Sequence, residues 1–125
     1  RTSQMPYTIF QFQKDHRDSR ILAVQDWIED KYDQNFSYAE LARHHGMSRR
    51  TLERRFKAAT GDSPLSYQQR VRVEKAKRML EDGQRSFDEI TYQVGYEDSG
   101  SFRKVFLRHA GLRPNEYRNK FLRVL

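Results

Sequence analysis

Hydrophobic residues recur at helical spacing along most of the chain, and no long stretch alternates with the period of two that a strand requires. The first run predicts a helix whose opening turn can be capped by Asp18 or Ser19. The residues of this run share one helical face: Ile21, Val24, Ile28 and Tyr32. Later runs predict further helices over residues 38–45, 49–60, 65–81, 87–94, 101–110 and 114–122.

The pattern repeats within the chain. Ser37 and Glu40 have the spacing of a helix capping box, and so do Ser86 and Glu89, at a shift of 49. One extra residue in the following turn changes the shift to 50. The aligned pairs are Leu41 with Ile90, Gly46 with Gly95, Leu52 with Phe102, Arg54 with Lys104, Phe56 with Phe106, Gly61 with Gly111, Pro64 with Pro114, and Tyr67 with Tyr117.

Each copy predicts a short helix, a turn closed by a left-handed glycine and then a basic helix, which is typical of a helix-turn-helix unit. Two copies are too few for a solenoid. The predicted organisation is a linker over 1–17, a first unit over 18–62, a linker helix over 63–83 and a second unit over 84–125. The linker lacks helical periodicity, and we expect it to dock only weakly.

Charge is concentrated on the repeated part of the chain. The net charge is +7, yet residues 1–37 hold five basic and six acidic side chains, so residues 38–125 carry a net +8. A basic module indicates a polyanionic partner, with nucleic acid favoured over an anionic membrane surface. A basic but otherwise ordinary solvated surface is the alternative.

Several classes of function are excluded by what the sequence lacks. There is no cysteine, and none of the four histidines shares a helical face with another at metal-ligand spacing. Neither a glycine-rich phosphate loop nor a nucleophile motif occurs, so we expect no enzyme activity, cofactor or metal. No apolar run reaches about 18 residues and no signal peptide is visible, so a cytoplasmic protein is expected. Because the chain starts at Arg1 rather than Met, we expect it to be part of a longer protein.

Three stretches, RVRVEKAKRML, VGYEDSGSFRKVF and GLRPNEYR, resemble the AraC/XylS family of bacterial transcription regulators over residues 18–122. The resemblance implies an all-α fold of about seven helices, with two helix-turn-helix subdomains on either side of a long linker helix. Their two recognition helices would enter successive major-groove faces of one site. The segments GDSPLSYQQRVRVEKAK and GYEDSGSFRKVFLRHAGLRPNEYR are most similar to a subgroup in which a glutamine-amidotransferase-like domain precedes this module.

Transferred by position, the resemblance implies six residues in contact with bases: Arg50, Glu53, Arg54, Ser99, Arg103 and Lys104. Their chemistry agrees, because arginine can bond guanine O6 and N7 together and glutamate can accept from cytosine N4. Gly100 and Leu107 depart from the family pattern. Many members have a longer polar residue in place of Gly100, and lysine often replaces Leu107, so one phosphate contact is expected to be missing.

Phosphate contacts are expected at the starts of the two basic helices and beside them. Backbone amides near Ser48 and Ser101 can bind a phosphate, and Arg49 and Arg55 can reach one. Arg55 has the alternative of pairing with a neighbouring carboxylate.

The expected partner is double-stranded promoter DNA, with RNA polymerase as a second candidate and no membrane. The module should act as a monomer, and the full-length protein could be dimeric through an upstream domain. The rival hypothesis is a helical protein-interaction module that keeps this fold without binding DNA, and acidic or neutral recognition helices would be its sign.

Overall fold

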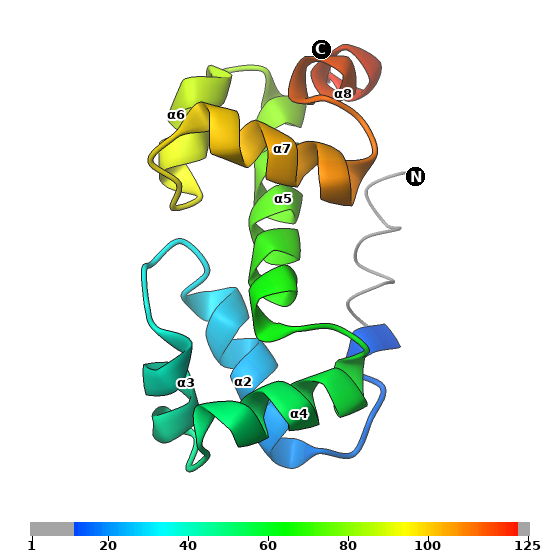
Figure 1. Cartoon of the computed structure of the whole chain (residues 1–125). Coiled ribbons are helices and arrows are strands. Elements are labelled where there is room, and N and C mark those ends of the chain that lie inside the picture. Colours follow the sequence, from blue (N-terminus) through cyan, green and yellow to red (C-terminus); the bar gives the residue numbers. More distant parts are fainter. Residues whose placement is uncertain (1–11, 123–125) are drawn as a thin grey trace. The chain divides into compact units, whose positions relative to one another are not determined.

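The computed structural model describes residues 12–122, and within this range the chain forms seven helices and no strand (Figure 1). The helices are α2 (Ser19–Asp30), α3 (Tyr38–His44), α4 (Arg49–Thr60), α5 (Pro64–Asp82), α6 (Phe87–Gln93), α7 (Ser99–Ala110) and α8 (Pro114–Phe121). The expected all-α fold is therefore confirmed. No helix of the described range has the length and apolar character to cross a membrane.

The chain divides into two compact units. Unit 1 comprises residues 1–31 and 35–68, and unit 2 comprises residues 32–34 and 69–125. The long helix α5 contributes its first residues to unit 1 and the rest to unit 2.

In unit 1, α3 and α4 form the helix-turn-helix and α4 packs on α2 (Figure 1). The core of this unit is filled by aliphatic and aromatic side chains that are 1% exposed or less: Ile21, Val24, Ile28, Leu41, Leu52, Phe56 and Tyr67. Ile21, Val24 and Ile28 come from the face that the sequence predicts for the first helix. Tyr32, the fourth residue of that predicted face, lies beyond the end of α2 and packs on the core of unit 2 instead. Burial of the unit 1 core removes the apolar surface of four helices from water and holds α4 with its opposite, charged face outward.

The residues just before α2 pack on the rest of unit 1 through polar contacts. The Lys14 ammonium lies 3.1 Å from Asp26 and 3.0 Å from Glu29, and the His16 ring lies 2.8 Å from the amide oxygen of buried Gln25. Burial opposes the charge of Lys14, but its hydrogen bonds to the two carboxylates outweigh burial and raise its pKa. Residues 1–11 of the expected linker lie outside the described range.

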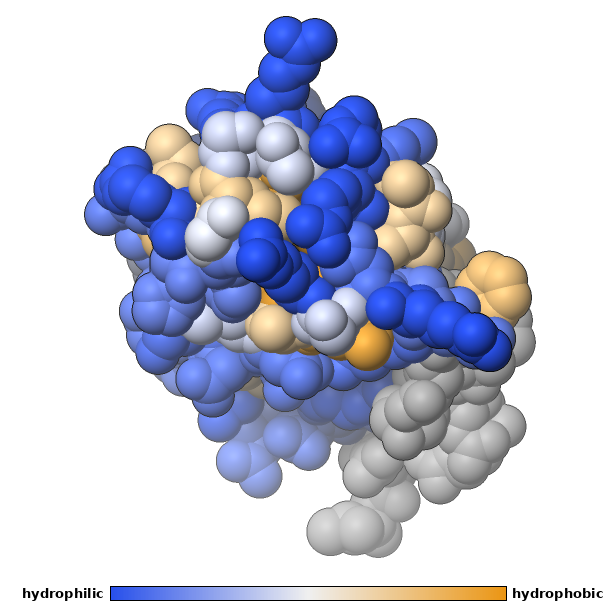
Figure 2. Space-filling model, turned by 90° about the horizontal axis from the view of Figure 1, so that it is seen from below, coloured by the Kyte–Doolittle hydropathy of each residue, from blue (hydrophilic) through white to orange (hydrophobic). Residues whose placement is uncertain are grey.

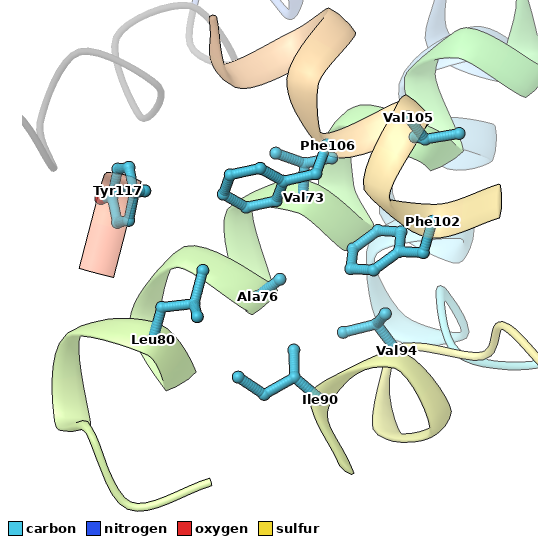
Figure 3. Packing of buried hydrophobic residues seen from close by; sticks show 9 residues of the cluster. All are labelled: Val73, Ala76, Leu80, Ile90, Val94, Phe102, Val105, Phe106 and Tyr117. Carbon is cyan, nitrogen blue, oxygen red and sulfur yellow. The ribbon is translucent and has the colours of Figure 1, made fainter. Parts of the chain in front are cut away.

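In unit 2, α6 and α7 form the second helix-turn-helix, and their apolar faces meet α5 and α8 (Figure 3). The core shown in Figure 3 comprises Val73, Ala76, Leu80, Ile90, Val94, Phe102, Val105, Phe106 and Tyr117. The Phe102 ring packs edge-on against Phe106 and stacks with Phe87, with centroid separations of 6.2 and 5.6 Å. These ring contacts orient α7, again leaving one face of the helix to solvent.

The internal repeat is visible in the ends of the helices. Ser37 and Ser86 each cap a short helix in a complete capping box. The turns after these helices contain Gly46 at φ +73° and Gly95 at φ +100°, a left-handed backbone that favours glycine. At Gly95 a Cβ atom would also lie 2.7 Å from the carbonyl oxygen of Asp33. The second turn therefore requires glycine for its conformation and for its close packing.

A buried tyrosine occupies the same repeat position in each unit. Tyr67 of α5 donates its hydroxyl to Glu29, and Tyr117 of α8 donates to Glu81, each at 2.5 Å. Burial, followed by the neighbouring carboxylate, raises the pKa of both hydroxyls, so both remain protonated donors. The repeat thus preserves a buried hydrogen bond as well as the hydrophobic pattern.

Candidate nucleic-acid interface

Helix α4 begins beside the glycine turn of unit 1 at a neutral cap. The Ser48 hydroxyl accepts from the Thr51 backbone N–H at 3.1 Å, and Gly61 ends the helix in the left-handed conformation at φ +79°. The expected cap and stop are both confirmed. A neutral cap leaves the positive end of the helix dipole uncompensated by side-chain charge.

The outward face of α4 carries three cations. Arg50, Arg54 and Lys57 are exposed and lie on the side opposite buried Leu52 and Phe56. Within residues 12–122, the side chains of Arg50 and Arg54 form no hydrogen bond or ion pair. Figure 2 views the side of unit 1 on which α4 lies, where hydrophilic residues dominate and hydrophobic ones form small separate patches. Two long arginines are therefore available to an external acceptor.

Two other charged residues of α4 are already paired. Arg49 donates from Nε to Glu53 at 3.0 Å, one helical turn along an exposed face. Glu53 is a base-contact candidate and Arg49 is a phosphate candidate, so each would have to leave this pair to reach DNA. Exposed pairs of this spacing are weak, at about 0.3–0.5 kcal/mol, and a stronger partner can replace them.

The Arg55 side chain points toward the start of α2, within unit 1. Its Nε and Nη2 atoms donate to Asp18 at 3.0 and 2.6 Å, so the guanidinium binds both carboxylate oxygens of the residue that caps α2. The hydrogen bonds from Arg55 hold the pKa of Asp18 below its ordinary value. The structure thus shows the carboxylate pairing that the sequence leaves as an alternative. The position fifty residues later is Val105, which is buried, so both units turn this position inward.

Helix α7 presents its own candidates opposite Phe102 and Phe106. Arg103 and Lys104 are exposed, and the Arg103 guanidinium lies over the Phe87 ring at 5.1 Å from its centroid. This stacking limits the positions of the Arg103 head while leaving its donors in solvent.

The start of α7 differs from the sequence-based expectation. The helix begins at Ser99, two residues before the predicted start at Ser101, and Asp98 is its cap. Ser101 donates its backbone N–H and its hydroxyl to the Asp98 carboxylate at 2.8 and 2.7 Å. These hydrogen bonds lower the pKa of Asp98 and keep it ionised. The Ser101 amide is therefore occupied by an anion from its own chain.

The two candidate helices consequently begin with opposite charge. Residues 47–50 read Met-Ser-Arg-Arg, with two cations, whereas residues 97–100 read Glu-Asp-Ser-Gly, with two anions. Asp98 is fifty residues after Ser48, and the internal repeat could have identified it as the cap. The hydrophobic pattern could not, because Phe102, the first apolar residue of α7, lies four residues after the cap.

Comparison with known proteins agrees with this architecture. A model of the helix-turn-helix domain family matches residues 41–120. The chain belongs to this helix-turn-helix family. It is also 33% identical over 103 residues to the HTH-type transcriptional activator RhaS of Klebsiella pneumoniae. The aligned region covers 82% of this chain and 37% of that activator. The chain thus spans little more than a third of the length of this relative.

Two solved structures resemble this chain in sequence and in fold. The DNA-binding domain of AdpA, solved in complex with a target DNA, is 34% identical with a TM-score of 0.74, covering 81% of this chain and 91% of that chain. An AraC-type regulator from Chromobacterium violaceum is 25% identical with a TM-score of 0.76. The match covers 82% of this chain and 91% of that regulator's chain. The resemblance to the AraC family is therefore confirmed for the helix-turn-helix module.

Proposed function

We propose that the chain is a sequence-specific, double-stranded DNA-binding module of a transcription regulator. The observation that carries this proposal is the outward face of α4, where Arg50 and Arg54 are exposed and unpaired within residues 12–122 and follow a glycine turn. An arginine held on a rigid helix can present a planar fork to guanine in the major groove. AdpA, a relative of similar fold, is known in complex with its target DNA.

Base contacts are assigned to the outward faces of α4 and α7. The proposed residues are Arg50, Glu53 and Arg54 from α4 and Ser99, Arg103 and Lys104 from α7. We propose that the two helices enter adjacent major grooves on one face of the duplex, about 10 bp apart. One chain then carries both reading elements and binds as a monomer.

Phosphate contacts are divided unevenly between the two helix starts. The neutral Ser48 cap and the nearby Arg49 favour a phosphate at α4, where the helix dipole attracts an anion. Asp98 disfavours a phosphate at α7, so Ser101 is the weaker of the two candidates. Arg55 is the weakest candidate of all, because its fork already binds Asp18.

The remainder of the regulator is proposed from resemblance alone. A glutamine-amidotransferase-like domain upstream of residue 18 would supply dimerisation and effector response, and RNA polymerase would be a partner of the assembled protein. The RhaS relatives support a role in activation, because they are named as transcriptional activators. Purifying the longer protein and measuring its mass in solution tests the upstream domain and the dimer together.

Selection of binding sites from a random duplex pool tests the function of the module itself. We expect one enriched site with two short conserved blocks about 10 bp apart. If six to eight phosphates are neutralised, the affinity for this site should fall with salt at a log–log slope of roughly −5 to −7. No enrichment together with a slope near zero would instead favour the protein-interaction module.

A further inference from the structure

Leu107 is an exposed leucine on a helix face that is otherwise charged. Its side chain lies on α7 with 43% of its surface accessible, while Phe102, Val105 and Phe106 of the same helix are buried. It follows Lys104 by three residues and Arg103 by four, the two spacings that place residues side by side on one helical face. Leu107 therefore belongs to the face from which Lys104 and Arg103 would reach a duplex.

The same outward positions carry different chemistry in the two units. In α4 they are occupied by Arg50, Arg54 and Lys57, which are all cationic. Fifty residues later they are occupied by Gly100, Lys104 and Leu107. A bare glycine and an apolar side chain thus replace two charges, although buried Leu52 and Phe56 of α4 correspond to buried Phe102 and Phe106 of α7.

This composition fits one feature of the major groove. A leucine has no donor for a phosphate or a base edge, whereas the C5-methyl group of thymine is the apolar group that the groove presents. Gly100 has no side chain on this face, and an added Cβ would lie in ordinary contact with the Asp98 carboxylate, 3.4 Å away. Glycine on this face lets the helix backbone lie nearer to the base edges than arginine would.

We propose that Leu107 is a specificity-determining residue that contacts the methyl group of a thymine in the major groove. The inference rests on the proposed DNA-binding function. It assigns different recognition chemistry to the two helices: α4 reads with charged hydrogen-bond donors, and α7 reads partly by apolar contact. Cations flanking Leu107 keep the helix on the duplex while the leucine distinguishes thymine from bases without the methyl group.

Replacing thymine by uracil tests this directly, because uracil keeps every hydrogen-bonding atom and lacks only the methyl group. With the selected site, each thymine in the block bound by α7 is changed to uracil in turn and the affinity is measured. One position should weaken binding of the unmodified protein about three- to fourfold, as expected for the loss of one buried methyl contact. Leu107→Ala should bind thymine and uracil equally at that position.

Two further variants make the test specific. Leu65→Ala removes a leucine of similar exposure from the start of α5, outside α7, and should keep the thymine preference. Leu107→Lys copies Lys57; it should remove the preference and steepen the salt slope by about one. Retention of the preference in Leu107→Ala, or equal binding of uracil at every position, overturns the inference while leaving the proposed function intact. A failure of the unmodified protein to bind any duplex would instead contradict the proposed DNA-binding function.

Discussion

Arg54 and Arg55 are consecutive residues of α4 with opposite surroundings. Arg54 is exposed and has no partner within residues 12–122, whereas Arg55 is partly buried and binds Asp18 through two donors. One residue along a helix turns a side chain by about 100°, which is enough to move it from the outward face to the flank of the core. The hydrophobic spacing separates their two faces, and the packing of α4 against the start of α2 gives Arg55 its partner.

Substituting the two arginines should therefore affect different properties. We expect Arg54→Ala to cost about 1–3 kcal/mol of binding to the selected site and to relax the preference at one base position. Arg55→Ala should lower the melting temperature while leaving base preference and the salt slope unchanged. Binding to the site and its single-base variants at several salt concentrations, with thermal unfolding, measures both. A loss of base preference in Arg55→Ala alone would show that the outward face has been misassigned.

The stability effect of Arg55 should depend on pH in a defined direction. Because Arg55 lowers the pKa of Asp18 in the folded protein, the pair stabilises the fold above the ordinary pKa of an aspartate. This contribution is lost as the pH falls through the lowered pKa of Asp18. The melting temperatures of the unmodified protein and Arg55→Ala should thus differ at neutral pH and converge in acid.

At the scale of elements, the two helix-turn-helix units share a scaffold and differ at the start of the second helix. Both first helices carry capping boxes, and both second helices end at a left-handed glycine, Gly61 or Gly111. The caps differ, with neutral Ser48 in one unit and ionised Asp98 in the other. A carboxylate at a helix start satisfies the same amide and also offsets the positive end of the dipole.

Exchanging the caps should change DNA binding more than folding. Asp98→Ser keeps a capping acceptor and removes the charge, so it should raise the affinity for random duplex about two- to fivefold with little change in melting temperature. Ser48→Asp should lower that affinity by a similar factor. Titrations of both variants at two salt concentrations measure the effect. Unchanged affinity in both would mean that neither helix start lies near phosphate.

At the scale of the whole molecule, one chain carries two helix-turn-helix units. A single polypeptide therefore presents both candidate reading helices, α4 and α7. Helix α5 carries residues of both hydrophobic cores, Tyr67 in the first and Val73 in the second. The charge that attracts DNA is likewise a property of both units together.

The module should accordingly bind its site as one molecule. Sedimentation of the complex should give one protein per duplex, and hydroxyl-radical footprinting should show two protected blocks about 10 bp apart on one face of the duplex. Arg54→Ala should weaken protection in one block and Lys104→Ala in the other, which provides an internal control. A strict ratio of two proteins per site, or a single protected block, would contradict the proposed arrangement.

The sequence by itself determined the helices, the repeat and the family, because these depend on local periodicity and on fixed spacings. Capping boxes at Ser37 and Ser86 and left-handed glycines at Gly46 and Gly95 are short-range features, so their residues alone specify them. The hydrophobic spacing likewise identifies which face of α4 is buried, and hence that Arg54 faces outward.

Only the tertiary structure decided which charged residues are available. Arg55 and Asp18 are 37 residues apart, and no local rule joins them before α2 and α4 pack together. Tyr67 and Glu29 meet in the same way, across 38 residues. The cap of α7 was missed for a different reason, since it could be found from the repeat, fifty residues after Ser48, and not from the hydrophobic spacing. Packing brings distant charges into contact, and this pairing determines which cations of a basic helix can bind DNA.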